Sequence, residues 1–132
     1  MNRSDTIFAV SSGSGVAGIA VIRMSGPASH KILELVSGTL PRPRLASVRR
    51  LRDPASREVI DQAMVLWIPG PNSATGEDVA EFHVHGSIAV IDALLRIFQD
   101  FEGVRLAEAG EFSRRAFMND RMDLVEAEGL SD

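Results

Sequence analysis

The side chains with the clearest chemical potential lie in one short run, where Glu81, His83 and His85 occupy alternate positions. Successive side chains of a β-strand point to opposite faces, so three alternate residues would share one face of a sheet. A carboxylate and two imidazoles in such a row could hold a metal ion. The row is also typical of a polar strand beside a loop, and this interpretation is favoured because the pattern supplies no further ligands.

A second candidate is Arg23, which interrupts the apolar run Ile19–Met24. Strand alternation would place it on the same side as Ile19 and Val21. A charged group in weakly polar surroundings needs a partner, because an unpaired charge is costly to bury. The pattern leaves two partners open, an anionic ligand or a nearby carboxylate.

Two phosphate-binding patterns can be assessed directly. Residues 13–18 match G-x-G-x-x-G, but a dinucleotide site needs a helix to follow, and Ile19–Ile22 favours a strand. We therefore expect a flexible loop there. The only lysine, Lys31, lies outside any glycine-rich loop. The chain as given therefore has no P-loop and is not itself a P-loop nucleotide hydrolase.

A basic stretch follows between residues 42 and 57. It could contact RNA phosphates, but no aromatic residue interleaves it to stack on bases. A solvated face is the favoured interpretation, with RNA contact as the alternative. The stretch comprises Arg42, Arg44, Arg49, Arg50, Arg52 and Arg57.

Composition limits the remaining classes. The chain has 132 residues, 45% of them hydrophobic and 24% charged, with a net charge of −4. These values predict one globular domain with its own core. With no cysteine, disulfide scaffolds, thiol nucleophiles and cysteine-ligated metals are excluded. No apolar run is long enough to span a membrane, so we expect a cytoplasmic protein.

The elements that would position these residues follow from hydrophobic patterning. We expect an α+β fold, with helices packed on a mixed, largely antiparallel sheet of about five strands. The turn-rich segment Pro69–Glu77 is typical of a functional loop. The expected strands are Thr6–Val10, Ile19–Met24, Leu45–Leu51, Val59–Ile68 and Val79–Val84, with Val104–Leu106 as a candidate edge strand, and the expected helices are Ala28–Val36, Ile88–Phe101 and Glu111–Met118.

The end of the chain suggests a further unit. Asp123 and Glu126 have the spacing of a capping box, so a new helix should begin there. Only about two turns could follow, and isolated helices of that length are marginal in water. We expect the chain to be cut just inside the next structural unit.

Four segments closely resemble the MnmE/TrmE family of tRNA-modification GTPases. The most specific is PGPNSATGEDVAE at 69–81, followed by HVHG at 83–86. The others occur in the same order as in the family, and the resemblance covers nearly the whole chain. They are DTIFA at 5–9, VIRMSG at 21–26, and GEFSRRAF at 110–117 running into NDRMDLVEAE at 119–128.

The resemblance implies an N-terminal domain over residues 1–118 and the start of a helical domain at 119–132. Such a domain is similar in fold to the folate-binding domains of one-carbon-transfer enzymes. It would form a homodimer and bind 5-formyl-tetrahydrofolate or a related reduced folate. The whole enzyme, with a flavoprotein partner, would add an aminomethyl-type group to carbon 5 of the wobble uridine of tRNA. GTP, magnesium and potassium would bind only to a GTPase domain that this chain lacks.

By the same resemblance, the folate contacts fall on Arg23, Glu81 and Arg121. At the third position many members have lysine, and arginine keeps the charge with a different geometry. One carboxylate can accept the amino group and the ring N–H of a pterin together, a role that suits Glu81. The arginines suit the ring carbonyl, the formyl oxygen or the glutamate tail. The alternatives are that Glu81 neutralises His83 or Arg23, and that the domain is an RNA-contacting or purely structural dimerisation scaffold.

Overall fold

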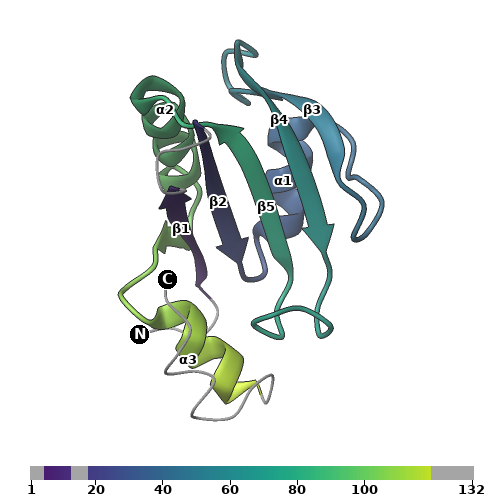
Figure 1. Cartoon of the computed structure of the whole chain (residues 1–132), viewed down its shortest axis with the longest axis vertical. Coiled ribbons are helices and arrows are strands. Elements are labelled where there is room, and N and C mark those ends of the chain that lie inside the picture. The colour runs from purple at the N-terminus through teal and green to yellow at the C-terminus, as the bar shows by residue number, and fades with distance from the viewer. Residues whose placement is uncertain (1–4, 13–17, 120–132) are drawn as a thin grey trace.

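The computed structural model describes residues 5–12 and 18–119, which form a sheet with three helices (Figure 1). The expected α+β class is confirmed, and the candidate edge strand brings the sheet to six strands. The elements are β1 (Thr6–Ser12), β2 (Ile19–Ser25), α1 (Ser29–Ser37), β3 (Ser47–Arg52), β4 (Val59–Ile68), β5 (Val79–His85), α2 (Ile88–Gln99), β6 (Val104–Leu106) and α3 (Glu111–Met118).

The strands lie in the order β3-β4-β5-β2-β1-β6. Only the short outer pair β1 and β6 is parallel, and every other neighbouring pair is antiparallel. β2 and β5 are therefore central neighbours, although more than fifty residues separate them in sequence. This pairing determines which side chains meet in the middle of the sheet.

The hydrophobic core lies on one face of the sheet, beneath α1 and α2. Alternate residues of β2 and β5 are fully buried there, while those between them face the other way. Figure 1 shows both helices behind the sheet and α3 beyond its end, so no helix of the described residues covers the opposite face, which we call the open face. The core residues of these elements are Ala20, Ile22, Met24, Ile32, Leu33, Val36, Ala80, Phe82, Val84, Leu94, Ile97 and Phe98.

Local signals mark the start of α2 and the end of α1. The Ser87 side chain accepts a hydrogen bond from Val90 N at 3.2 Å and caps α2. α1 ends at Gly38, whose positive φ of 95° suits glycine. No helix in the described part of the chain combines the length and apolar character needed to cross a membrane.

The glycine-rich loop leads directly into β2 and not into a helix, since Gly18 precedes the strand. The pyrophosphate-binding helix end that a dinucleotide site requires is therefore absent at this position. Residues 13–17 of that motif lie outside the described residues.

Candidate functional site

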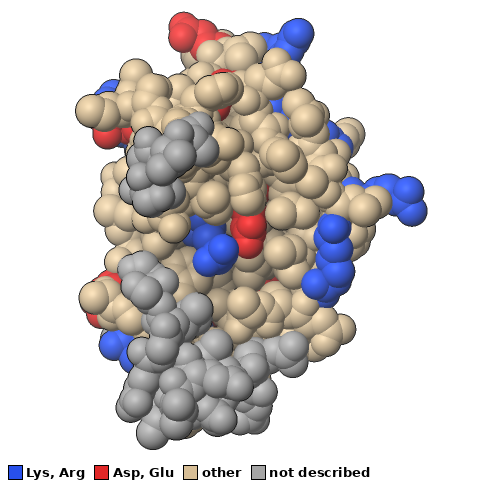
Figure 2. Space-filling view, in the orientation of Figure 1, with Lys and Arg blue, Asp and Glu red and all other residues tan. Residues whose placement is uncertain are grey.

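The structure brings Arg23 and Glu81 together on the open face of the sheet. They are directly opposed in the antiparallel β2–β5 pair, and Arg23 Nε donates to Glu81 Oε2 at 3.1 Å. The arginine side chain is 44% exposed and the glutamate 15% exposed, so the pair is accessible from solvent. Figure 2 shows one basic group beside one acidic group in the middle of this face, with mostly uncharged residues around them.

His83 holds the second oxygen of the same carboxylate. Its Nε2 lies 3.0 Å from Glu81 Oε1, so Glu81 contacts both of the partners that the sequence proposes for it. A carboxylate has about four lone-pair positions, and two protein contacts leave acceptor capacity for a ligand. The arrangement therefore holds the carboxylate in position without saturating it.

His85 lies apart from this group. Its Nδ1 is 2.7 Å from Asp61 Oδ1, and its backbone N–H donates to the other oxygen of Asp61 at 2.8 Å. Among residues 5–12 and 18–119, no three His, Asp or Glu side chains are placed to hold one metal ion. The three alternating polar residues thus fall into two separate groups, Glu81 and His83 in one and His85 with Asp61 in the other.

An open hollow of about 380 Å³ continues from His83 across β4 toward β3. Mainly apolar walls with a few polar groups are typical of sites for small organic ligands. Arg23 and Glu81 are not among its lining residues, and His83 connects it to their ion pair. The lining residues are Ile19, Val48, Gln62, Ala63, Met64, His83, Val84 and His85.

On the other side of the ion pair, the loop before β5 is fastened to β2. Ser25 lies two residues after Arg23, and its Oγ is 2.7 Å from Thr75 Oγ1 and donates to Glu77 Oε1 at 2.7 Å. Ser25 and Thr75 are buried. The segment expected to be a functional loop is therefore firmly held beside Arg23 and Glu81.

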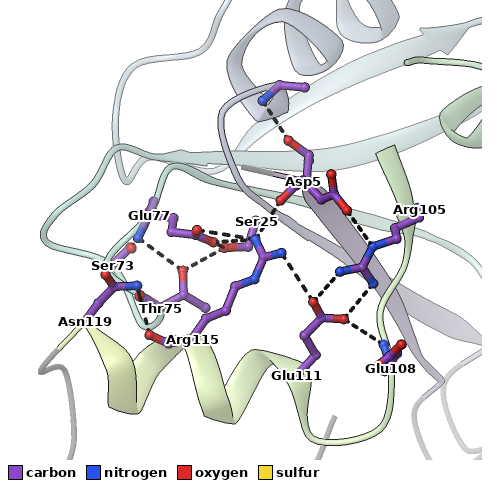
Figure 3. A network of polar contacts seen from close by, with 12 residues as sticks. Asp5, Ser25, Ser73, Thr75, Glu77, Arg105, Glu108, Glu111, Arg115 and Asn119 are labelled. Atoms are coloured by element: carbon purple, nitrogen blue, oxygen red, sulfur yellow. Dashed lines mark hydrogen bonds and ion pairs between the residues drawn. The ribbon is translucent and has the colours of Figure 1, made fainter. Parts of the chain in front are cut away.

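A buried network of charges holds α3 against this loop (Figure 3). Arg115, only 7% exposed at its side chain, donates to Glu77 Oε1 at 3.0 Å and to the Asp5 carbonyl at 2.7 Å. Its other nitrogen donates to Glu111 Oε2 at 3.3 Å. One guanidinium thus joins α3 to the loop and to Asp5, the residue before β1.

Glu111 is fully buried at the centre of this network. Arg105 donates to both of its oxygens, at 2.8 and 2.6 Å, and the Glu108 backbone N–H donates at 2.9 Å. Burial alone would raise the pKa of Glu111, but the hydrogen bonds from Arg105 and Glu108 outweigh it and lower the pKa to about 2. The hydrogen bond to Glu111 likewise raises the pKa of Arg105.

The end of α3 also contacts the loop. Asn119 Nδ2 donates to the carbonyl oxygens of Thr75 and Arg115, both at 2.9 Å. The chain therefore leaves α3 close to the loop that borders Arg23 and Glu81. Arg121, the third residue of the expected folate site, lies outside the described residues.

Sequence reasoning did not identify the charged network as a unit. The available signal was the i,i+4 spacing of Glu111 and Arg115, which usually marks an exposed helical ion pair. Both residues are buried here. They contact residues from β6, from the loop and from the position before β1, which are Arg105, Glu77 and Asp5. Such distant partners leave no local pattern.

Comparison with known proteins places these features in a family. The model of the family described as "GTP-binding protein TrmE N-terminus" matches residues 6–121. The chain is 55% identical over 130 residues to a tRNA modification GTPase MnmE from Methylorubrum populi, covering 98% of this chain and 29% of that protein. It is 56% identical over 129 residues to an MnmE from Phenylobacterium zucineum, covering 98% of this chain and 28% of that protein.

A mitochondrial relative is equally similar. The human protein named 5-taurinomethyluridine-[tRNA] synthase subunit GTPB3, mitochondrial, is 56% identical over 129 residues, covering 96% of this chain and 26% of that protein. The chain therefore spans less than a third of the length of these curated relatives.

Proposed function

The chain belongs to the family of TrmE N-terminal domains, and from this premise we propose that it binds a reduced folate, 5-formyl-tetrahydrofolate or a close relative, on the open face of its sheet. The observation that carries the proposal is the accessible Arg23–Glu81 ion pair, in which the acid is held on both oxygens. A site organised before binding loses little entropy when the ligand arrives.

The recognition chemistry is that of a forked hydrogen bond. Glu81 accepts the amino group and the adjacent ring N–H of the pterin, and a hydrogen bond to a charged group is worth about 1.5–3 kcal/mol. The remaining donors of Arg23 serve a carbonyl, formyl or carboxylate oxygen of the ligand. Arg121 is the third proposed contact.

Calorimetric titration with 5-formyl-tetrahydrofolate tests this proposal. We expect saturable heat of binding from the wild-type chain at neutral pH. The absence of heat, in a sample shown to be folded by circular dichroism, contradicts folate binding. It leaves the alternative of a dimerisation scaffold without a folate.

For the whole protein we propose the arrangement that the family resemblance implies. Residues 1–118 form the folate-binding and dimerisation domain, and 119–132 begin a helical domain. The complete protein hydrolyses GTP, with magnesium and potassium, in a separate domain. With a flavoprotein partner it adds an aminomethyl-type group to carbon 5 of the wobble uridine of tRNA. We propose a cytoplasmic location.

We propose that a second copy of the chain packs on the part of the open face away from Arg23 and Glu81, so that the proposed folate contacts stay accessible. Ile19, Val48 and Met64 are 50%, 64% and 44% exposed there, and apolar groups gathered on a surface are typical of interaction sites. An isologous contact would cover them in both copies.

Glutamate at position 64 should weaken this dimer, because a charge would be buried in the contact. We expect sedimentation velocity to show a concentration-dependent dimer for the wild type and a shift of at least tenfold in its dissociation constant for Met64→Glu. The matched control is Ile88→Glu, since Ile88 is 79% exposed at the start of α2. A wild type that stays monomeric at high concentration, or equal effects of both variants, contradicts dimerisation through this face.

A further inference from the structure

Basic charge is concentrated along the outer strand β3 and the connectors on either side of it. Residues 40–58 contain six arginines and two acidic residues, a net charge of +4, while the rest of the chain carries −8. Figure 2 shows basic side chains gathered along the side of the molecule where Figure 1 shows β3. We call this set the arginine edge: Arg42, Arg44, Arg49, Arg50, Arg52 and Arg57.

Within the described residues, no side chain of the arginine edge is paired with a carboxylate. Arg44, Arg49 and Arg52 instead donate to backbone carbonyls, those of Asn72, Thr39 and Arg57. Four arginines elsewhere in the described residues behave differently. Ion pairs to acidic side chains are formed by Arg23, Arg105, Arg114 and Arg115.

Hydrogen bonds to carbonyls orient a guanidinium without neutralising it. The arginine edge therefore presents positive charge that the protein does not compensate, partly held in fixed directions. Planar guanidinium groups of this kind suit phosphate oxygens, which they can bind through two parallel hydrogen bonds.

We propose that the arginine edge binds the phosphate backbone of an RNA, which, if the proposed function holds, is the tRNA that the whole protein modifies. Residues 42–57 contain no aromatic side chain to stack on bases, so contact would be with the backbone and independent of base sequence. An acidic protein surface is less suited, because protein interfaces are typically built around aromatic and apolar anchors.

The arginine edge lies close to the proposed folate site. β4 alone separates β3 from β5, and neighbouring strands are about 4.8 Å apart. Strand β5, which carries Glu81, therefore lies roughly 10 Å from the arginine edge. An RNA backbone held along β3 would pass close to the proposed folate site.

Fluorescence anisotropy of a labelled tRNA transcript, measured from 50 to 200 mM salt, tests this inference. The test variant is Arg42→Gln/Arg50→Gln, since neither side chain has a partner in the described structure and the fold should be unaffected. The control with the same charge change is Arg96→Gln/Arg114→Gln, which removes two exposed arginines on α2 and α3.

We expect the test variant to bind at least tenfold more weakly at 50 mM salt, with the slope of log affinity against log salt reduced by about 1.5. The control should bind within about twofold of wild type, because it removes only long-range attraction to the RNA, which salt screens. No binding by the wild type, or equal losses in both variants, overturns the proposal. Unchanged tRNA binding by the test variant also overturns it. Folate titration of the same variants keeps this outcome separate from that of the folate site.

Discussion

Glutamine in place of Glu111 is expected to lower the free energy of unfolding by about 3–5 kcal/mol at pH 7. The fully buried carboxylate accepts four hydrogen bonds, from Arg105, Arg115 and the Glu108 backbone. Glutamine removes the negative charge that offsets two guanidinium groups, one of them only 7% exposed. Leaving a buried charge partly uncompensated is among the more destabilising consequences of a single substitution.

Urea unfolding followed by circular dichroism measures the effect. The matched control is Glu108→Gln in the same segment. The Glu108 side chain is 66% exposed, and its Oε1 forms a long ion pair of 3.6 Å with Arg114 Nη2. An exposed ion pair of that kind contributes about 0–1 kcal/mol. Equal losses for the two variants would show that the network in Figure 3 does not hold α3 in place.

The same carboxylate should make stability depend on pH. Its pKa is about 2 in the folded chain against 4.5 ordinarily, so the stabilising charge is fully present above about pH 4.5. Stability should then be lost as the pH falls from 4.5 toward 2, by about 3 kcal/mol from this group. Unfolding curves at pH 7, 4.5 and 3 measure the loss, and Glu111→Gln should flatten it. An unchanged pH profile in that variant would contradict the role assigned to Glu111.

Glutamine at position 81 is expected to weaken binding of 5-formyl-tetrahydrofolate by about 100-fold or more. The substitution replaces a charged acceptor with a neutral amide, and removes the charge-assisted bonds to the pterin amino group and ring N–H. It also leaves Arg23 without the carboxylate that orients it at 3.1 Å. The loss should therefore exceed that of a single neutral hydrogen bond.

Calorimetric titration of the variant and of the wild type gives the ratio of their dissociation constants for 5-formyl-tetrahydrofolate. Glu58→Gln makes the same chemical change at an exposed position in the β3–β4 connection, and should bind within about twofold of wild type. Glu81→Gln is not expected to unfold the chain, because Glu81 lies on the open face and not in the core. Undiminished affinity in a folded Glu81→Gln sample would remove the carboxylate from the site.

Local patterning predicts most elements to within a few residues, and the differences have physical causes. β4 has the predicted bounds, Val59–Ile68. β3 starts two residues later than expected, because Arg44 takes a positive φ of 66° and its N–H bonds to Trp67 O before regular pairing begins. α2 ends at Gln99, where tight turns at Asp100 and Phe101 replace the helical pattern.

The site was only partly predictable for a different reason. Alternation along a strand indicates that Glu81 and His83 share a face, but it says nothing of which strand lies next to them. Arg23 and Glu81 are opposed by the pairing of two strands, across a sequence separation of 58 residues. The hydrogen bond from Arg115 to the Asp5 carbonyl joins residues that are 110 positions apart. Long-range pairing of this kind is determined by the packing of the whole sheet and leaves no trace in local spacing.

The most direct test of the folate site is a crystal structure of the chain soaked or co-crystallised with 5-formyl-tetrahydrofolate. We expect the pterin on the open face of the sheet, its amino group and ring N–H within hydrogen-bond distance of the Glu81 carboxylate, and Arg23 against an oxygen of the ligand. A folate bound elsewhere, with the Arg23–Glu81 pair untouched in a fully occupied crystal, would contradict this expectation.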